Sequence, residues 1–291
     1  MKNWKVAVVV LGMVILSGPV LSADDQTAKV FKPTSINVGT EFSYFHYEEP
    51  DFMEDKGYLY GVFANVSHRI SQNQPIKSLG DIFANGNTLN AYELDGRLSF
   101  GYVDYESRST GSLDDIRDYI FELRGTAGYD MPLCNAFTLT PYVGLGYRYL
   151  NDDSGGKRTT TGAAGYERES NYFYLPLGIK GLATLGNGWS VGLSGEYDIF
   201  LYGRQISHLS DAVAGLGDVE NDQDSGYGLR ASLKVMKETA TANFFIEPFV
   251  RYWNVDDSEI SPVTYNGVLA GFGLEPENNS MEVGFRAGIN F

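Results

Sequence analysis

Apolar and polar residues alternate with a period of two along most of this chain. In residues 281–291, Met281, Val283 and Phe285 share one face, while Glu282 and Arg286 lie on the other. Successive side chains of a β-strand point to opposite faces, so this stretch predicts an amphipathic strand. The same alternation occurs in ten stretches of the chain. The predicted strands lie near residues 34–47, 57–70, 89–104, 116–130, 136–150, 168–184, 188–203, 225–237, 242–254 and 280–291.

The connections between these strands alternate between short and long. Short connections are predicted at residues 130–135, 185–187 and 238–241, and long ones near 48–56, 105–115, 151–167, 204–224 and 255–279. The connection 71–88 is the exception, because it is long where a short turn is expected. An even strand number with alternating loop lengths is typical of transmembrane barrels. The pattern therefore predicts an all-β fold, a closed antiparallel transmembrane β-barrel of about ten strands; a soluble sandwich is the alternative.

The polar faces of the strands carry eight acidic and eight basic residues, so their charges cancel. A balanced set suits a narrow lumen, where pairing offsets the cost of burying charge. Ten strands also leave little room once long side chains fill the interior. We therefore predict a plugged, charge-filled lumen. Its acidic members are Glu41, Glu93, Asp95, Glu122, Glu196, Asp198, Glu247 and Glu282, and its basic members are Arg97, Arg124, Arg148, Lys180, Arg230, Lys234, Arg251 and Arg286.

Tyrosine and tryptophan collect near the predicted strand ends, as expected for aromatic girdles at a membrane interface. The alternative is that these residues reflect β-propensity alone. The candidate girdle residues are Tyr44, Tyr47, Tyr58, Tyr60, Tyr102, Tyr105, Tyr147, Tyr149, Tyr172, Tyr174, Tyr252 and Trp253.

The N-terminal residues 1–23 have the pattern of a cleaved signal peptide. Lys2 and Lys5 precede a short apolar run, and Ser22 and Ala23 supply small residues for cleavage. We therefore expect a signal peptide at residues 1–23, followed by one barrel domain at 24–291. The single cysteine, Cys134, excludes an internal disulfide.

The formal net charge is −15, and removing Lys2 and Lys5 with the signal lowers it to −17. Such an acidic chain is not expected to bind nucleic acid through charge. Because the strand charges balance, the acidic excess is expected in the long loops. These loops are expected to attract a cationic or extracellular ligand.

One acidic loop is a candidate calcium site, and no other cofactor is predicted. Asp218, Glu220, Asp222 and Asp224 provide the oxygen ligands that Ca²⁺ prefers. The alternative is a solvated acidic loop, or one that reaches lipopolysaccharide through divalent cations.

Basic residues near the long loops are candidates for contact with lipopolysaccharide phosphates. They are Lys157, Arg158, Arg168 and Arg204.

A second candidate site combines a histidine with carboxylates. His208 and Asp211 follow the seventh predicted strand, and Asp104 and Glu106 lie just past the third. A histidine and a carboxylate that face a second carboxylate pair could activate a water for peptide hydrolysis. The alternative is a loop histidine and a polar rim.

The chain resembles bacterial outer-membrane β-barrels in its final strand, which ends on Phe291. In those proteins the terminal Phe belongs to the signal read by the barrel-assembly machinery. Size, signal, strand number and loop rhythm also resemble the omptin family of outer-membrane proteases and the Opc-type adhesin barrels. Asp104-Tyr105-Glu106 is a near match for the omptin Asp-x-Asp pair. His208 and Asp211 depart from the omptin Asp-x-His pair in order and spacing.

The resemblance implies a Gram-negative outer membrane, contact with its lipid and lipopolysaccharide, and either a protease or an adhesin activity. Our leading interpretation is a surface-exposed structural or binding protein, adhesin-like, that acts through its acidic long loops. The alternatives are an omptin-like aspartate/histidine endopeptidase and a narrow channel.

Overall fold

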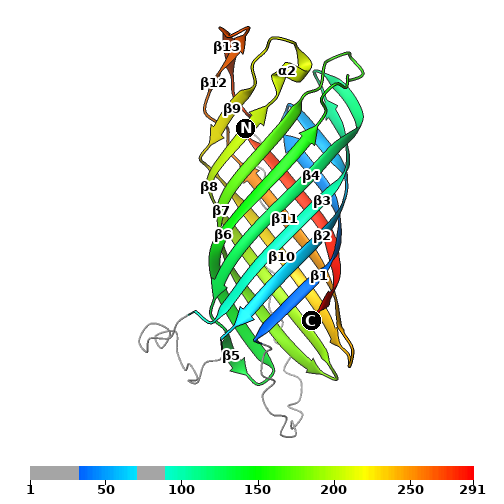
Figure 1. The fold of residues 1–291 in the computed structure, drawn as a ribbon, viewed down its shortest axis with the longest axis vertical. Coiled ribbons are helices and arrows are strands. Elements are labelled where there is room, and N and C mark those ends of the chain that lie inside the picture. The colour runs from blue at the N-terminus through cyan, green and yellow to red at the C-terminus, as the bar shows by residue number, and fades with distance from the viewer. Residues whose placement is uncertain (1–32, 71–88) are drawn as a thin grey trace. The chain divides into compact units, whose positions relative to one another are not determined.

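The computed structural model describes residues 33–70 and 89–291. The predicted signal peptide and the unusual connection 71–88 lie outside these residues. In the described part of the chain, ten long antiparallel strands form a barrel (Figure 1). They are β1 (Thr34–Glu49), β2 (Met53–Arg69), β3 (Ala91–Ser107), β4 (Gly111–Gly128), β6 (Phe137–Asp153), β7 (Glu167–Gly186), β8 (Trp189–Ser207), β10 (Gly226–Glu238), β11 (Asn243–Val255) and β14 (Asn278–Asn290).

The barrel closes through pairing of β8 with β10. Around the wall the strands follow the order β10, β11, β14, β1, β2, β3, β4, β6, β7 and β8. All of these pairings are antiparallel, and β1 and β14 pair with Glu41 opposite Arg286. The predicted fold class is confirmed. No helix in residues 33–70 and 89–291 is long and apolar enough to cross a membrane.

Short elements lie at the two ends of the barrel. β5 (Met131–Cys134) pairs with β6, and β9 (Val219–Gln223) extends the sheet beside β8. The turn α2 (Leu209–Ala212) precedes β9. The strands β12 (Ser261–Tyr265) and β13 (Val268–Gly273) form a separate hairpin at the end of the barrel opposite β5 (Figure 1). We call this end the outer end, because it carries the long connections.

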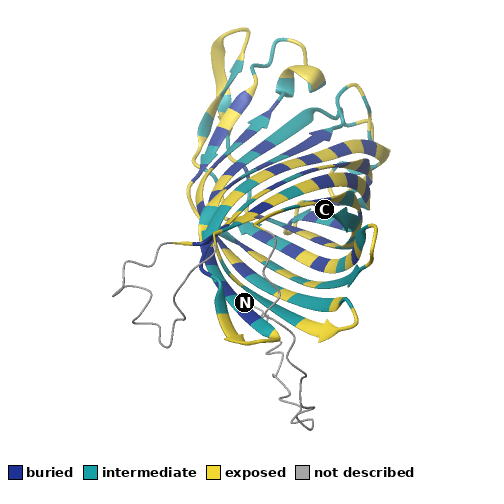
Figure 2. Ribbon diagram, turned by 60° about the horizontal axis from the view of Figure 1, so that its bottom comes forward, coloured by how far each residue is buried: buried dark blue, intermediate teal, exposed yellow. Residues whose placement is uncertain are grey.

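Exposed and buried residues alternate along the strands, as the banding in Figure 2 shows. On β2, Tyr58, Tyr60 and Val62 are exposed, whereas Leu59 and Phe63 are buried in the lumen. The outward side chains thus form an apolar band suited to lipid, and the inward positions fill the barrel.

Several residues predicted for the aromatic girdle lie inside the barrel instead. Tyr58, Tyr60 and Tyr102 are exposed on the wall, but Tyr172 and Trp253 are buried in the lumen. Tyr47 and Tyr174 are buried there as well. The strands are 13–20 residues long, whereas a tilted transmembrane strand needs about 9–11. Their outer ends therefore have inward positions that apolar and aromatic side chains fill.

Two inward glycines make room for tyrosine rings across the strand pair β6–β7. Tyr174 lies opposite Gly146, and Tyr142 lies opposite Gly178. A Cβ atom at either glycine would overlap the facing ring. Each ring occupies the space that a side chain would take at the facing glycine, and the Tyr174 hydroxyl donates to Glu122 Oε1 at 2.5 Å.

We predict that Gly146→Val destabilises the barrel by about 1–3 kcal/mol, because it displaces the Tyr174 ring and its hydrogen bond to Glu122. The free energy of unfolding in urea, measured on barrel refolded in detergent, tests this. Gly125→Val is the matched control, since Gly125 is exposed on the wall and has no atom within 4 Å of an added Cβ. Equal stability of the two variants would contradict the packing role of Gly146.

Candidate functional site

Arg97 is the centre of an ion-pair layer halfway along the lumen. Its guanidinium donates to Glu122 at 2.8 Å, to Glu41 at 3.0 Å and to Glu282 at 2.7 and 2.8 Å. These carboxylates come from β4, β1 and β14. Arg251 adds ion pairs of 3.2 Å to both Glu41 and Glu282. All of these groups are buried, so the pairing offsets the cost of their desolvation.

A second guanidinium links distant parts of the wall. Arg230 on β10 pairs with Glu122 on β4, and with Asp198 at 2.5 Å and Glu196 at 3.2 Å on β8. Three strands separate β4 from β10 on one way round the barrel and five on the other. The Arg230–Glu122 pair therefore crosses the lumen, which is filled by charged side chains at this level.

All sixteen predicted lumen residues point inward, and thirteen of them form ion pairs within 4.0 Å. Arg148, Lys234 and Glu247 form none in the described part of the chain. Arg148 lies beside the Tyr172 and Trp253 rings, 5.7 and 5.9 Å from their centroids. Aromatic faces and hydroxyl or amide groups thus replace the expected ionic partners of these three residues.

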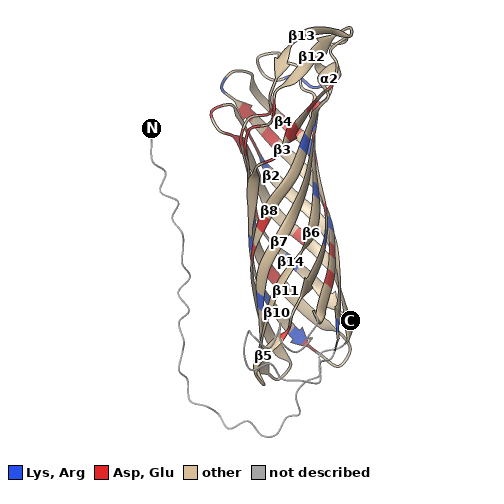
Figure 3. Cartoon of the chain, turned by 90° about the vertical axis from the view of Figure 1, so that its left-hand side faces the viewer, with Lys and Arg blue, Asp and Glu red and all other residues tan. Residues whose placement is uncertain are grey.

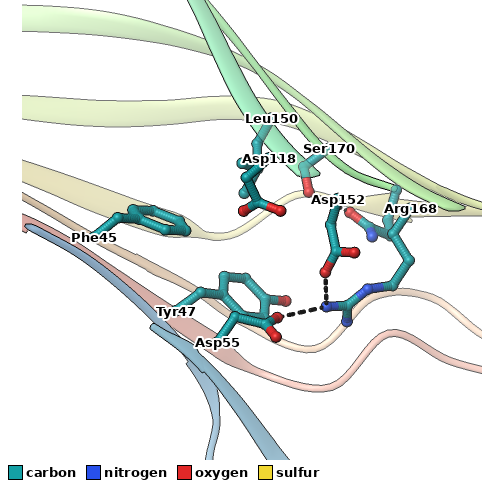
Figure 4. Close-up of a pocket in the computed structure, with 9 residues that line it drawn as sticks. Phe45, Tyr47, Asp55, Asp118, Leu150, Asp152, Arg168 and Ser170 are labelled. Atoms are coloured by element: carbon teal, nitrogen blue, oxygen red, sulfur yellow. Dashed lines mark hydrogen bonds and ion pairs between the residues drawn. The ribbon is translucent and has the colours of Figure 1, made fainter. Parts of the chain in front are cut away.

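A cavity opens in the lumen toward the outer end, above the ion-pair layer. It is small, with room for about one water-sized species, and it is partly open. Phe45 and Leu150 supply apolar side chains, and Asp55, Asp118 and Asp152 project carboxylates into it (Figure 4). We call this the acidic cavity.

Arg168 is the cation of the acidic cavity. Its guanidinium donates to Glu49 at 2.6 Å, to Asp55 at 3.1 Å and to Asp152 at 3.0 Å. Figure 4 shows the last two contacts as dashed lines. Asp118 adds a further carboxylate to the same cavity. One guanidinium therefore does not neutralise this group of acids.

Glu275, on the connection between β13 and β14, is a further buried acid beside the acidic cavity. The Tyr47 hydroxyl lies 3.3 Å from both Glu275 Oε1 and Glu49 Oε1 and can donate to either. Burial, and then the charge of Glu49, raise the pKa of Glu275 to about 7. Glu275 is thus a titrating group at the outer end near neutral pH.

His208 lies at the outer rim and is held by two carboxylates. Its Nδ1 is 2.9 Å from Asp218 and its Nε2 is 3.1 Å from Glu169. Burial opposes protonation, but the hydrogen bonds to Asp218 and Glu169 outweigh it and raise the pKa of His208. The expected partner Asp211 instead accepts a hydrogen bond from the backbone N–H of Glu167 at 3.2 Å.

The structure does not bring the two halves of the predicted hydrolytic site together. Asp104 and Glu106 are exposed on the outer face of β3. A β-bulge lies at this point of the β3–β4 pair, and Asp104 accepts a hydrogen bond from the Asp115 backbone N–H at 3.1 Å. Carboxylates on the outside of the wall cannot face His208, which follows β8 and is separated from β3 by the three strands β4, β6 and β7.

Three of the four acids of the predicted calcium loop are engaged by basic side chains. Arg204 pairs with Glu220 at 2.9 Å and with Asp222 at 2.8 Å. Asp218 accepts from His208, and Asp224 is exposed. Calcium binding by this loop stays a prediction.

Another group meets the geometric requirement for a metal more closely. Among the described residues, His46, Glu48 and Glu54 place three ligand atoms within 4.8 Å of one another. They are half-buried.

The four basic residues expected to contact lipopolysaccharide lie in different parts of the structure. Arg168 points into the lumen, because its ion pairs with Glu49, Asp55 and Asp152 require it there. Arg204 lies at the rim in its ion pairs. Lys157 donates to the backbone carbonyl of Asp115 on β4, and Arg158 donates to that of Gly162. Phe291, the predicted insertion signal, is exposed, and its backbone pairs with Ile36.

Sequence reasoning missed the acidic cavity. Asp118 lies on the same face of β4 as the predicted lumen residue Glu122, four positions away, so extending that face would have identified it. The sequence pattern predicts Asp55 and Asp152 in loops, but β2 begins at Met53 and β6 ends at Asp153. The strands are longer than the apolar alternation indicates.

We predict that stability of the outer end falls as pH rises from about 4.5 to about 7, because folding holds Glu275 protonated over that range. Above about pH 7 Glu275 is ionised in the folded state as well, so stability falls no further. Hydrogen exchange of residues 256–277 measures it, and Glu275→Gln should remove the pH dependence by keeping a neutral partner for Tyr47. Glu277→Gln is the control, since Glu277 is exposed. An unchanged pH profile in the Glu275 variant would contradict the assignment.

Comparison with known proteins places this architecture among outer-membrane barrels. Residues 79–200 match the family model of the autotransporter beta-domain. The structure resembles that of the outer membrane protease OmpT from Escherichia coli, with a TM-score of 0.60 and 9% sequence identity over 91% of this chain and 99% of that chain. It also matches the translocator domain of the autotransporter NalP from Neisseria meningitidis, with a TM-score of 0.43 and 12% identity over 90% of this chain and 89% of that chain. No curated protein sequence matches this chain. The chain therefore has the fold of a bacterial outer-membrane β-barrel.

Proposed function

We propose that this protein is a surface-exposed binding barrel, adhesin-like, with a closed lumen, and that its outer end engages a cationic protein partner. The observation that carries this proposal is the β12–β13 hairpin. It exposes apolar side chains among acidic loops. The exposed set comprises Ile260, Tyr265, Val268, Leu269, Phe272 and Leu274.

The hairpin is a defined structure rather than a loose loop. Asn266 and Gly267 have positive φ angles of 50° and 77°, as the tight Asn-Gly turn of a hairpin requires. The Asn266 N–H donates to Gly215 at 2.7 Å, and the Gly217 N–H donates to Thr264 at 2.9 Å. These bonds tie the hairpin to the connection between β8 and β10. A fixed surface loses less entropy on binding than a mobile one.

The surroundings of the hairpin are strongly negative. The two connections that surround it, residues 208–225 and 256–277, together hold ten acidic residues and no lysine or arginine. Figure 3 shows acidic residues gathered around the outer end. A field of one sign accelerates the encounter with a partner of the opposite sign, and apolar contact then prolongs the complex. A cationic protein with an apolar patch fits both features.

The ion-pair layer argues against the channel alternative. Arg97 and Arg230 fill the lumen together with their carboxylates, and the Arg230–Glu122 pair crosses it. The endopeptidase alternative gains no support from the geometry, because Asp104 and Glu106 lie on the outer face of the wall.

The remaining partners follow from the barrel's setting. The apolar outer band contacts membrane lipid and lipopolysaccharide, and the last strand, with Phe291, engages the barrel-assembly machinery. The exposure of Phe285 and Phe291 along that strand supports this contact.

We predict that barrel in lipid vesicles binds a peptide of alternating lysine and phenylalanine more tightly than a polylysine of the same length. Phe272→Ser should weaken binding of the first peptide about tenfold, since burying a Phe contributes roughly 1.5–3 kcal/mol. Binding of polylysine should not change. Isothermal titration calorimetry measures both affinities, and Phe52→Ser is the matched control, because Phe52 is also exposed in a long connection.

Equal affinity for the two peptides, or a Phe272 variant that binds like the wild type, would refute the role of the hairpin. Defined single-channel steps in a planar bilayer would refute the closed lumen.

A further inference from the structure

Three aspartates of the acidic cavity stand on three strands and point toward one space. Asp55 lies on β2, Asp118 on β4 and Asp152 on β6, and their exposed fractions are 1%, 3% and 6%. Asp118 and Asp152 are directly opposite each other in the β4–β6 pair. Like charges at opposed positions of neighbouring strands destabilise a sheet. Packing alone therefore does not explain this arrangement.

Each of the three carboxylates keeps an oxygen without a partner. Arg168 engages the Oδ2 atoms of Asp55 and Asp152. The Oδ1 atoms of Asp55, Asp118 and Asp152 are buried and accept no hydrogen bond in the described part of the chain. Buried acceptors without a donor are costly, and charged ones more so. Three such atoms lining one cavity point to a ligand that is positively charged.

The charge around the cavity leads to the same conclusion. Asp55, Asp118 and Asp152, with Glu49 and Glu275 beside them, make five carboxylates near one guanidinium. Of the basic side chains in residues 33–70 and 89–291, Arg168 is the one within ion-pair distance of these acids. A doubly charged cation neutralises more of the excess than a singly charged one.

We propose that the acidic cavity is a binding site for a divalent cation of the calcium type, held by the Oδ1 atoms of Asp55, Asp118 and Asp152. Water completes the shell from the open mouth. Carboxylate oxygens are the ligands that calcium prefers, and its irregular shell of 6–8 ligands tolerates a site built from three strands. The free space is narrow and admits only a water-sized species, which favours a bare ion over an organic cation.

The carboxylates of the two other acidic groups at the outer end are already paired with basic side chains, so they are less available to a cation. The ligand atoms of His46, Glu48 and Glu54 lie closer to one another than those of the three aspartates do. An ion bound in the acidic cavity must therefore pull the three aspartate side chains closer together. However, Lys56 and His46 already pair with Glu54. The loop at residues 218–224 is similarly engaged by Arg204 and His208.

The test uses calcium chloride alone, titrated into full-length barrel refolded in detergent free of lipopolysaccharide, which itself binds calcium. Asp118→Asn removes one ligand charge while keeping its shape. It leaves no guanidinium unpaired, because Arg168 pairs with Asp55 and Asp152 instead. We expect calorimetric binding by the wild type, a thermal midpoint that rises with calcium, and at least about tenfold weaker binding by the variant.

Two matched variants locate the site. Glu54→Gln disrupts the His46 group and Asp222→Asn disrupts the loop at 218–224, and both should bind calcium like the wild type. A heat-dependent gel shift establishes that each variant is folded. If Asp118→Asn does not fold, Asp152→Asn takes its place with the same expected loss.

The proposal is overturned if the wild type takes up no calcium, if the Asp118 variant binds it unchanged, or if the Glu54 or Asp222 variant loses it.

Discussion

The buried guanidinium of Arg97 is the constraint on which the lumen depends. It holds carboxylates from three other strands, and Arg251 and Arg286 balance the surplus of negative charge at Glu41 and Glu282. Removing one member of such a buried set costs about 3–5 kcal/mol, because its partners are left charged and unpaired. A slip of one residue between strands would also turn Glu41 toward lipid. Strand register, closure of the barrel and blockage of the lumen are thus consequences of the same contacts.

The alternation of apolar and polar residues was sufficient to predict the ten strands and the inward face of each, because that period depends on strand geometry alone. It fails where the wall continues beyond the lipid. There the outward face no longer needs to be apolar, as Glu54, Lys56 and Asp104 show on β2 and β3, so the pattern fades while the strand continues. For this reason Asp55 and Asp152 look like loop residues in the sequence but belong to the wall of the acidic cavity.

Two further features depend on contacts that no local pattern encodes. A tyrosine ring suits both a membrane interface and a packed lumen, and Tyr172 lies inside because Arg148 and Trp253 surround it there. The partner of His208 is set by how the chain folds back after α2, which brings Asp218 to its Nδ1 in place of the nearer Asp211. Neither outcome follows from spacing along the sequence.

Buried carboxyl groups have two opposite environments in the lumen. In the middle layer, guanidinium groups satisfy the carboxylates of Glu41 and Glu282 from several sides, as stability requires. In the acidic cavity, Asp118 is a buried carboxyl group with an unsatisfied oxygen, opposite another acid. The adjacent Phe45 and Leu150 show that apolar side chains fit at this level, so a stable barrel does not need Asp118. Departures of this kind from the rules of stability are expected where a protein binds something. The surplus of carboxylates is therefore better explained by a ligand than by the fold.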